Sequence, residues 1–228
     1  MRGKLILIEG TDCSGKQTQS ELLLKKLISD GRKVECLSFP MYDTPTGKII
    51  GGPYLGKESI CKSWFAEGAT NLDARVSSLY YAADRLYNIS KINKLLDEGI
   101  DVILDRYTTS NMAHQGGKVK EYKERQELYK WIDDLEYGFL KLPKPDFAYL
   151  LYMPHSYAQQ LRLSRSENEK LDEHENSEEH LKNAENAYLE LADIYNFTII
   201  NCVKDEKIES IDDINNELYN SITSKLQD

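Results

Sequence analysis

Short, mostly apolar runs recur along the chain and predict five β-strands. They cover residues 5–8, 34–39, 102–104, 147–152 and 197–201. Continuous apolar runs of this kind are typical of strands that are buried on both faces of a parallel sheet. The pattern therefore favours a sheet in the interior of the protein over a two-sided, half-exposed one.

Between these runs, apolar residues recur at helical spacing and predict helices over residues 19–29 and 72–98, with another near the carboxyl end. The long helix is marked by Val76, Leu79, Ala83, Leu86 and Tyr87. The last helix is marked by Ile211, Ile214, Leu218 and Ile222. Strands that alternate with helices predict an α/β fold, with a parallel five-stranded sheet flanked by helices.

The stretch GTDCSGKQTQ lies between the first predicted strand and the first predicted helix. It nearly matches the phosphate-binding pattern G-x-x-x-x-G-K-[ST], with Gly10, Gly15 and Lys16 in place. Backbone N–H groups of such a loop and the positive end of the next helix bind polyphosphate. A glycine-rich turn with an exposed lysine is the alternative, and the position between strand and helix favours the phosphate loop. The predicted ATP-binding residues are Gly10, Thr11, Asp12, Cys13, Ser14, Gly15, Lys16, Gln17 and Thr18.

The loop lacks the hydroxyl that normally follows its lysine and binds Mg²⁺. Gln17 stands at that position, and Thr18 comes one residue late. Mg²⁺ keeps several waters and takes few protein ligands, so a carboxylate elsewhere would be enough to hold it. Asp105 ends the third predicted strand, at the edge of the sheet where α/β proteins bind ligands. A magnesium ligand and a helix or turn cap are both open roles for Asp105, and the phosphate loop favours the first.

Three further side chains suggest a second, phosphorylated substrate. Arg106 follows Asp105 directly, and a permanent cation there suits a phosphate. Tyr81 and Arg85 are four residues apart on the long helix and share a face, so a ring and a guanidinium could bind a nucleotide base together. An intrahelical cation–π pair at the surface is the alternative for these two residues.

Together these segments resemble the thymidylate kinase family, whose members move the γ-phosphate of ATP to dTMP. The family segment E-G-x-D-x-x-G-K is present over residues 9–16, F-P over 39–40, D-R-Y over 105–107 and L-P-K-P-D over 142–146. The resemblance covers nearly the whole chain. It implies one P-loop nucleoside-monophosphate-kinase domain over residues 1–228, with Mg²⁺ as cofactor, a mobile lid near 162–180 and a homodimer.

The resemblance also assigns roles in substrate binding. It places Asp12 near the sugar hydroxyl, Tyr42 and Arg106 on the acceptor phosphate, Tyr81 against the thymine ring, Arg85 on a thymine carbonyl, Asn111 near the base edge and His114 at the sugar pocket. Two of these positions depart from the common family pattern. Many relatives carry arginine where Tyr42 stands, and an aromatic residue often occupies the place of His114.

The family divides according to the location of its catalytic arginine. One group carries it directly after the loop aspartate, where this chain has Cys13. The resemblance therefore implies the other, bacterial type, with Arg162 and Arg165 in the lid as catalytic residues and Glu175 as a metal ligand. Residues 164–180 are almost entirely polar, and a solvated loop without a catalytic role is the alternative for this segment.

Charge and cysteine content narrow the possible partners. A net charge of −9 argues against a protein that coats nucleic acid. The four cysteines are scattered without a C-x-x-C pair, and no apolar run has the length of a signal peptide or a membrane span. We expect a cytoplasmic enzyme that binds ATP and dTMP. A kinase of another nucleoside monophosphate or of a deoxynucleoside, a GTP-binding switch and an inactive relative remain as alternatives, although the guanine-reading motif N-K-x-D is absent.

Overall fold

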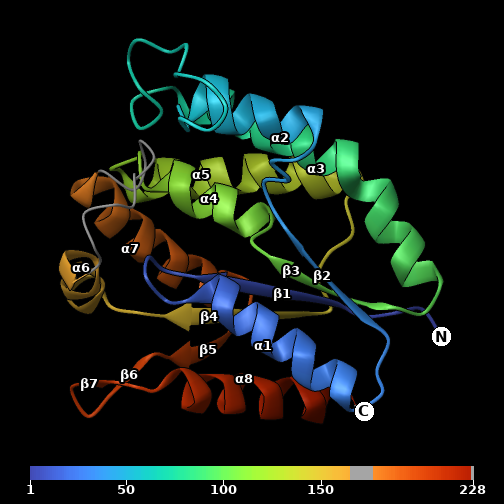
Figure 1. Ribbon diagram of the computed structural model, residues 1–228. Helices are drawn as coiled ribbons and strands as arrows, with labels where there is room; N and C mark the ends of the chain where they lie inside the picture. Colours follow the sequence, from blue (N-terminus) through green and yellow to red (C-terminus); the bar gives the residue numbers. More distant parts are fainter. Residues whose placement is uncertain (165–176, 227–228) are drawn as a thin grey trace.

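A parallel five-stranded sheet forms the centre of the protein, with the strand order β2–β3–β1–β4–β5 (Figure 1). The computed structural model describes residues 1–164 and 177–226. The five strands are β1 (Leu5–Gly10), β2 (Val34–Ser38), β3 (Asp101–Asp105), β4 (Phe147–Tyr152) and β5 (Thr198–Asn201). All five predicted strands are confirmed, and so is the α/β fold class.

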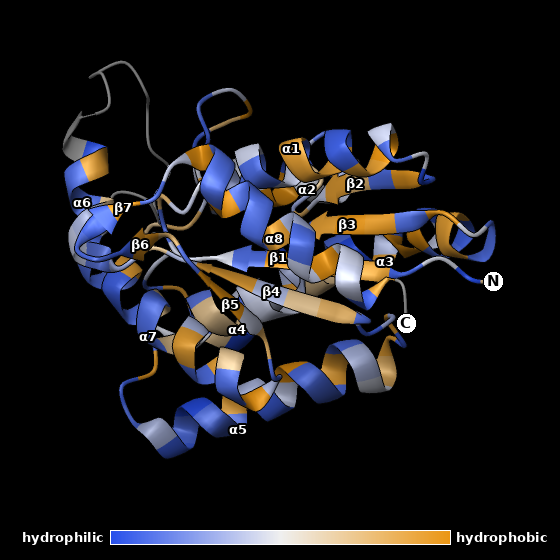
Figure 2. Cartoon of the chain, turned by 90° about the horizontal axis from the view of Figure 1, so that it is seen from below, coloured by the Kyte–Doolittle hydropathy of each residue, from blue (hydrophilic) through white to orange (hydrophobic). Residues whose placement is uncertain are grey.

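The sheet is covered by helices on both faces (Figures 1 and 2). The helices are α1 (Lys16–Ser29), α2 (Pro45–Ile49), α3 (Ala74–Asp97), α4 (Thr108–Gly116), α5 (Tyr122–Asp133), α6 (His155–Ser164), α7 (Glu178–Ile194) and α8 (Ile211–Lys225). Two π-helical turns, η1 (Ile50–Tyr54) and η2 (Asp134–Phe139), and a small hairpin of β6 (Val203–Lys204) and β7 (Lys207–Ile208) complete the described elements. Among these helices, none is both long and apolar enough to cross a membrane.

Alternate residues of β1 bury into different cores, as strand geometry requires. Ile6 and Ile8 join the core beneath α1 and α8, while Leu5 and Leu7 join the core beneath α3. A third core lies between α4, α5 and α7. Because the central strands are buried on both sides, their carboxyl ends are held rigidly at one edge of the sheet.

Much of helix α3 buries polar side chains and exposes apolar ones, the reverse of an ordinary amphipathic helix. Its predicted apolar positions lie on the outer face, where the side chains of Leu79 and Tyr87 are 50% and 57% exposed. Its buried face is polar over Asp84, Arg85 and Asn88, whereas Ile92 and Leu96 near its end are apolar and join the core. The helix itself is confirmed, and it begins after Asp73, whose carboxylate accepts hydrogen bonds from the N–H groups of the first turn.

The chain between α2 and α3 packs into its own small aromatic cluster. This cluster is centred on Ile50, Tyr54 and Leu55. Lys118 anchors the segment, because its ammonium donates to the carbonyls of Ala69 and Leu72 at 2.7 and 2.9 Å and to Ser77 Oγ at 3.2 Å. The cluster thereby forms a fixed wall above the carboxyl edge of the sheet.

Candidate active site

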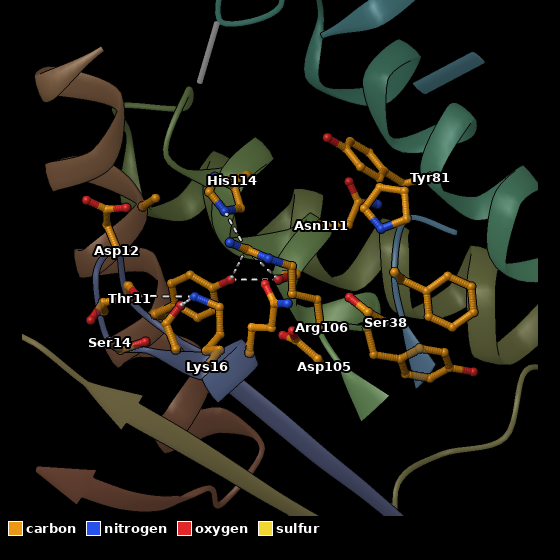
Figure 3. A pocket seen from close by; sticks show the side chains of 18 of the residues that line it. Thr11, Asp12, Ser14, Lys16, Ser38, Tyr81, Asp105, Arg106, Asn111 and His114 are labelled. Atoms are coloured by element: carbon orange, nitrogen blue, oxygen red, sulfur yellow. Dashed lines mark hydrogen bonds between the residues drawn. The ribbon is translucent and has the colours of Figure 1, made fainter. Parts of the chain in front are cut away.

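A cavity of about 430 Å³ opens at the carboxyl edge of the sheet. Strand register brings its parts together, because Asp105 at the end of β3 is paired with Ile8 of β1 and Ser38 of β2. The predicted site residues that line this cavity are Gly10, Thr11, Asp12, Cys13, Ser14, Gly15, Lys16, Gln17, Thr18, Tyr42, Tyr81, Arg85, Asp105, Arg106, Asn111 and His114. Figure 3 shows Lys16 and Asp12 on one side and Tyr81 and Asn111 on the other, with Asp105 and Arg106 between them.

The loop after β1 is compact and closely packed. A Cβ on Gly10 would lie 2.4 Å from Ser14 Oγ, and Gly15 adopts a left-handed conformation with φ of 73°. The Thr11 hydroxyl donates to the carbonyl of Met153 at 2.7 Å and accepts from its N–H at 2.8 Å. The loop is therefore tied both to α1, which starts at Lys16, and to the end of β4.

The ammonium of Lys16 lies inside this loop. It donates to the carbonyl oxygens of Gly10 at 2.9 Å and Thr11 at 3.2 Å. Burial lowers the pKa of Lys16 to about 8, and the nearby charge of Arg106 lowers it further, whereas Asp105 acts in the opposite direction. The cation is therefore stabilised weakly by the protein alone, and an anionic ligand would stabilise it more.

Asp105 fits a cation-binding role. Its side chain is buried, and its Oδ1 atom has no hydrogen-bond partner among the residues that the structure describes. Gln17 also lines the cavity, and its side-chain amide donates to Glu21 at 3.0 Å along the surface of α1. No cluster of three or more potential metal ligands occurs within residues 1–164 and 177–226, so a cation at Asp105 would keep most of its ligands as water or phosphate oxygen. Glu175, the second predicted metal ligand, lies outside the described residues.

Arg106 is held in place by a buried network that sequence reasoning missed. Its backbone is left-handed, with φ of 67°, and its Nη1 lies 3.3 Å from Ser110 Oγ and 3.2 Å from His114 Nε2. The carboxylate of Glu9 holds the following loop by accepting hydrogen bonds from the N–H groups of Tyr107 and Ser110 at 3.1 and 2.9 Å. Burial raises the pKa of Glu9 above its usual value, and its hydrogen bonds and the charge of Arg106 oppose that rise.

His114 connects Arg106 to the start of α7. Because the guanidinium of Arg106 can only donate, His114 accepts through Nε2 and donates through Nδ1 to His180 Nε2 at 3.2 Å. The two imidazole rings are stacked, with centroids 5.4 Å apart. Nothing in the spacing of the sequence indicated this contact.

At the other end of the cavity, Arg85 and Asn111, the candidates for reading a base, contact the buried carboxylate of Glu136. Arg85 is 2% exposed and donates through Nε and Nη2 to the two carboxylate oxygens of Glu136, at 2.5 Å each. Asn111 Nδ2 also faces this carboxylate, at 3.3 Å. The guanidinium of Arg85 lies over the ring of Tyr107, 6.0 Å from its centroid. Tyr81 instead packs edge-on against Tyr54. Arg85 is therefore buried against Tyr107 and does not form a surface cation–π pair with Tyr81.

Three predicted residues remain: Tyr42, Arg162 and Arg165. Tyr42 carries the ammonium of Lys57 at 4.9 Å from its ring centroid, and both side chains line the cavity. Arg162 donates to the carboxylate of Asp12 and makes two hydrogen bonds of 2.8 Å to Glu178 at the start of α7. Arg165 lies outside the described residues.

Comparisons with known proteins all identify the same family. A family model described as thymidylate kinase matches residues 8–214. The chain is 37% identical over 150 residues to a thymidylate kinase of Schizosaccharomyces pombe, covering 66% of this chain and 61% of that protein. It is 29% identical over 218 residues to a probable thymidylate kinase of Methanocaldococcus jannaschii, covering 93% and 92%. The match spans 61–65% of the length of the first three curated relatives.

The fold is also similar to that of a solved structure. This is a thymidylate kinase from Candida albicans, described as having broad substrate specificity, with a TM-score of 0.75 and 27% identity over 98% of this chain and 92% of that one. The similarity extends over nearly all of both chains. It agrees with a P-loop nucleoside-monophosphate-kinase fold.

Proposed function

The chain belongs to the thymidylate kinase family, and we propose that it transfers the γ-phosphate of ATP to dTMP, giving ADP and dTDP. The observation that carries this proposal is the single cavity that joins the phosphate loop to Arg106 and the base-reading side chains. A donor and an acceptor phosphate bound at its two walls would meet beside Asp105. Direct transfer between two bound nucleotides requires such an arrangement.

The donor wall would bind the phosphates of ATP through residues 10–18. On binding, Lys16 exchanges its contacts with the carbonyls of Gly10 and Thr11 for contacts with phosphate oxygens. Asp105 would hold Mg²⁺, directly or through water, together with Glu175, and this ion would neutralise charge on the phosphates. Little covalent work is left to the protein, so positioning and charge stabilisation carry the rate enhancement.

The catalytic arginines would come from a lid over residues 162–180, as in the bacterial type of the family. Arg162 already lies between Asp12 and Glu178. We propose that Arg162 moves from these carboxylates to the phosphates when the lid closes, joined there by Arg165. Closure would also exclude water and so limit ATP hydrolysis.

The acceptor wall would bind dTMP from phosphate to base. Arg106 and Tyr42 would contact its phosphate, and Asp12 and His114 its deoxyribose. Tyr81, which lines the cavity, would stack on the thymine ring. Arg85 and Asn111 would read the edge of the base.

We also propose a cytoplasmic homodimer built from one kinase domain over residues 1–228. Support for the dimer comes from the outer face of α3, where Val76, Leu79, Leu86 and Tyr87 are all exposed. A continuous apolar stripe of this kind is typical of a helix that packs against another chain. Burial of the stripe against a second copy would leave the cavity on the opposite side of α3 open.

The test is ADP release by the purified protein with Mg-ATP and each of dTMP, dUMP, dCMP, dAMP, dGMP, UMP and thymidine. Strong turnover with dTMP and little with UMP or thymidine is the expected result. Preference for another monophosphate would identify the chain as a different nucleotide kinase, an outcome of interest because the Candida albicans relative is described as broad in specificity. ATP binding without turnover on any acceptor would instead identify an inactive relative.

A further inference from the structure

The buried carboxylate of Glu136 contacts both side chains that would read the base. We propose that Glu136 is a positioning residue that fixes the hydrogen-bond polarity of the base-binding wall, so that the wall accepts a thymine-type edge and disfavours a cytosine-type edge. This inference rests on the proposed function. Neither the charge pattern nor the spacing of the sequence singled out Glu136, which lies on the π-helical turn η2.

The first support is the geometry of Arg85. Glu136 is fully buried and binds the side of the guanidinium formed by Nε and Nη2, while Nη1 makes one longer contact of 3.4 Å with the carbonyl of Tyr107. A guanidinium has five N–H groups in a rigid plane. The carboxylate therefore orients that plane and leaves its outer edge, toward Nη1, as a donor for a carbonyl oxygen on the base.

The second support is the orientation of Asn111. A carboxylate can only accept, so the contact of 3.3 Å with Glu136 places the Nδ2 group of Asn111 on the carboxylate side. The Oδ1 atom then faces the other way. It is buried without a hydrogen-bond partner in the described part of the chain, on a residue that is 3% exposed and lines the cavity.

A buried oxygen without a partner is costly and therefore indicates a missing donor. Arg85 and Asn111 thus present a donor and an acceptor, both fixed by one carboxylate. Thymine offers the matching pair, a carbonyl oxygen next to the N3–H group. Cytosine offers the reverse pair, an amino group next to an unprotonated N3, and would place donor against donor and acceptor against acceptor.

Glu136 is itself oriented by a neighbour. The hydroxyl of Thr108 donates to its Oε2 at 2.8 Å, and this residue begins α4, which also carries Asn111. The wall is thus assembled from three elements: α3 contributes Arg85, α4 contributes Thr108 and Asn111, and η2 contributes Glu136. Loss of the carboxylate would release Arg85 and Asn111 together.

The experiment compares steady-state kinetics of the wild type and Glu136→Gln with dTMP and dCMP at saturating Mg-ATP. Glutamine keeps the shape but replaces one carboxylate oxygen, which accepts from two donors, by an N–H₂ group, so both of these donors lose that acceptor. We expect kcat/KM for dTMP to fall roughly 10- to 100-fold, the scale of a lost hydrogen bond to a charged group. We expect the ratio of dTMP to dCMP turnover to fall as well, while KM for ATP stays unchanged.

The matched control is Glu190→Gln. Glu190 forms the same kind of fork with Arg125, at 2.9 and 2.5 Å, between α7 and α5, and neither residue lines the cavity. This variant should lose stability without any change in the ratio of dTMP to dCMP turnover. If Glu136→Gln does not fold, Thr108→Val keeps the carboxylate but removes the hydrogen bond from the Thr108 hydroxyl that orients it, and should shift the same ratio in the same direction.

The two levels of inference fail differently. A wild-type protein that does not phosphorylate dTMP refutes the proposed function. A wild-type protein that does so, together with variants that fold and keep an unchanged ratio of dTMP to dCMP turnover, refutes the role of Glu136 alone. A ratio that changes equally in Glu190→Gln would also refute it, because the effect would then follow from lost stability.

Discussion

The charge state of Lys16 predicts a specific pH dependence of ATP binding. With a pKa of about 8, the ratio of charged ammonium to neutral amine is roughly ten to one at pH 7 and about one to ten at pH 9. Because the pKa is lowered, the charged form dominates below pH 8 and is lost above it. If only the ammonium binds phosphate well, the dissociation constant for Mg-ATP should rise about tenfold from pH 7 to pH 9.

Isothermal titration of Mg-ATP without acceptor at pH 7, 8 and 9 measures this dependence. The control is Lys16→Arg, whose guanidinium stays charged throughout this range and should give weaker but nearly constant affinity. Equal affinity of the wild type at pH 7 and pH 9 would refute the reasoning. So would the same slope in Lys16→Arg, because the titrating group would then lie elsewhere.

Three further predictions concern the acceptor site, the cavity wall and the assembly. Replacement of Arg106 by alanine should lower kcat/KM for dTMP about 10²- to 10³-fold with unchanged ATP binding, and full activity in a steady-state assay would contradict its role. Burial lowers the pKa of Lys118 to about 8 from 10.5, so the folded protein releases this proton before the unfolded chain does. Between pH 8 and pH 10.5, the free energy of unfolding of the wild type should therefore rise by about 3 kcal/mol relative to that of Lys118→Met. Urea titrations that show the same difference in unfolding free energy at both pH values would contradict this prediction. The variant Leu79→Glu should sediment as a monomer and the wild type as a dimer; a monomeric wild type would exclude the proposed interface.

Local sequence patterns were sufficient to predict the sheet and one wall of the site. Apolar runs predicted the five strands because the central strands are buried on both faces and leave no alternation to confuse the pattern. Asp105 could be placed at the ligand-binding edge because it directly ends such a run. The geometry of the loop from Gly10 to Lys16 agreed with its motif, since such loops are determined by residues close in sequence.

Features that depend on contacts between distant elements could not be predicted in this way. The periodicity of α3 gave the helix but not its orientation, because the spacing of apolar residues does not show which face of a helix packs against the sheet. Glu136 is separated from Arg85 by 51 residues, and its burial depends on the packing of η2 against α3 and α4. The polar inner face of α3 and the pair of His114 with His180 likewise exist only after the helices have packed.

The position of Glu9 has a consequence for how substrate choice can evolve in this protein. Its backbone immediately precedes the donor loop, and its carboxylate holds the turn that carries Arg106. The separation between the two proposed phosphate sites is therefore set by a buried carboxylate at the end of the central strand β1, and substitutions there would disturb both proposed sites together. The base end is assembled from three separate elements and shares no such constraint. Changes in preferred nucleotide should accordingly accumulate around α3, α4 and η2, while the spacing of the phosphates stays the same from one variant to the next.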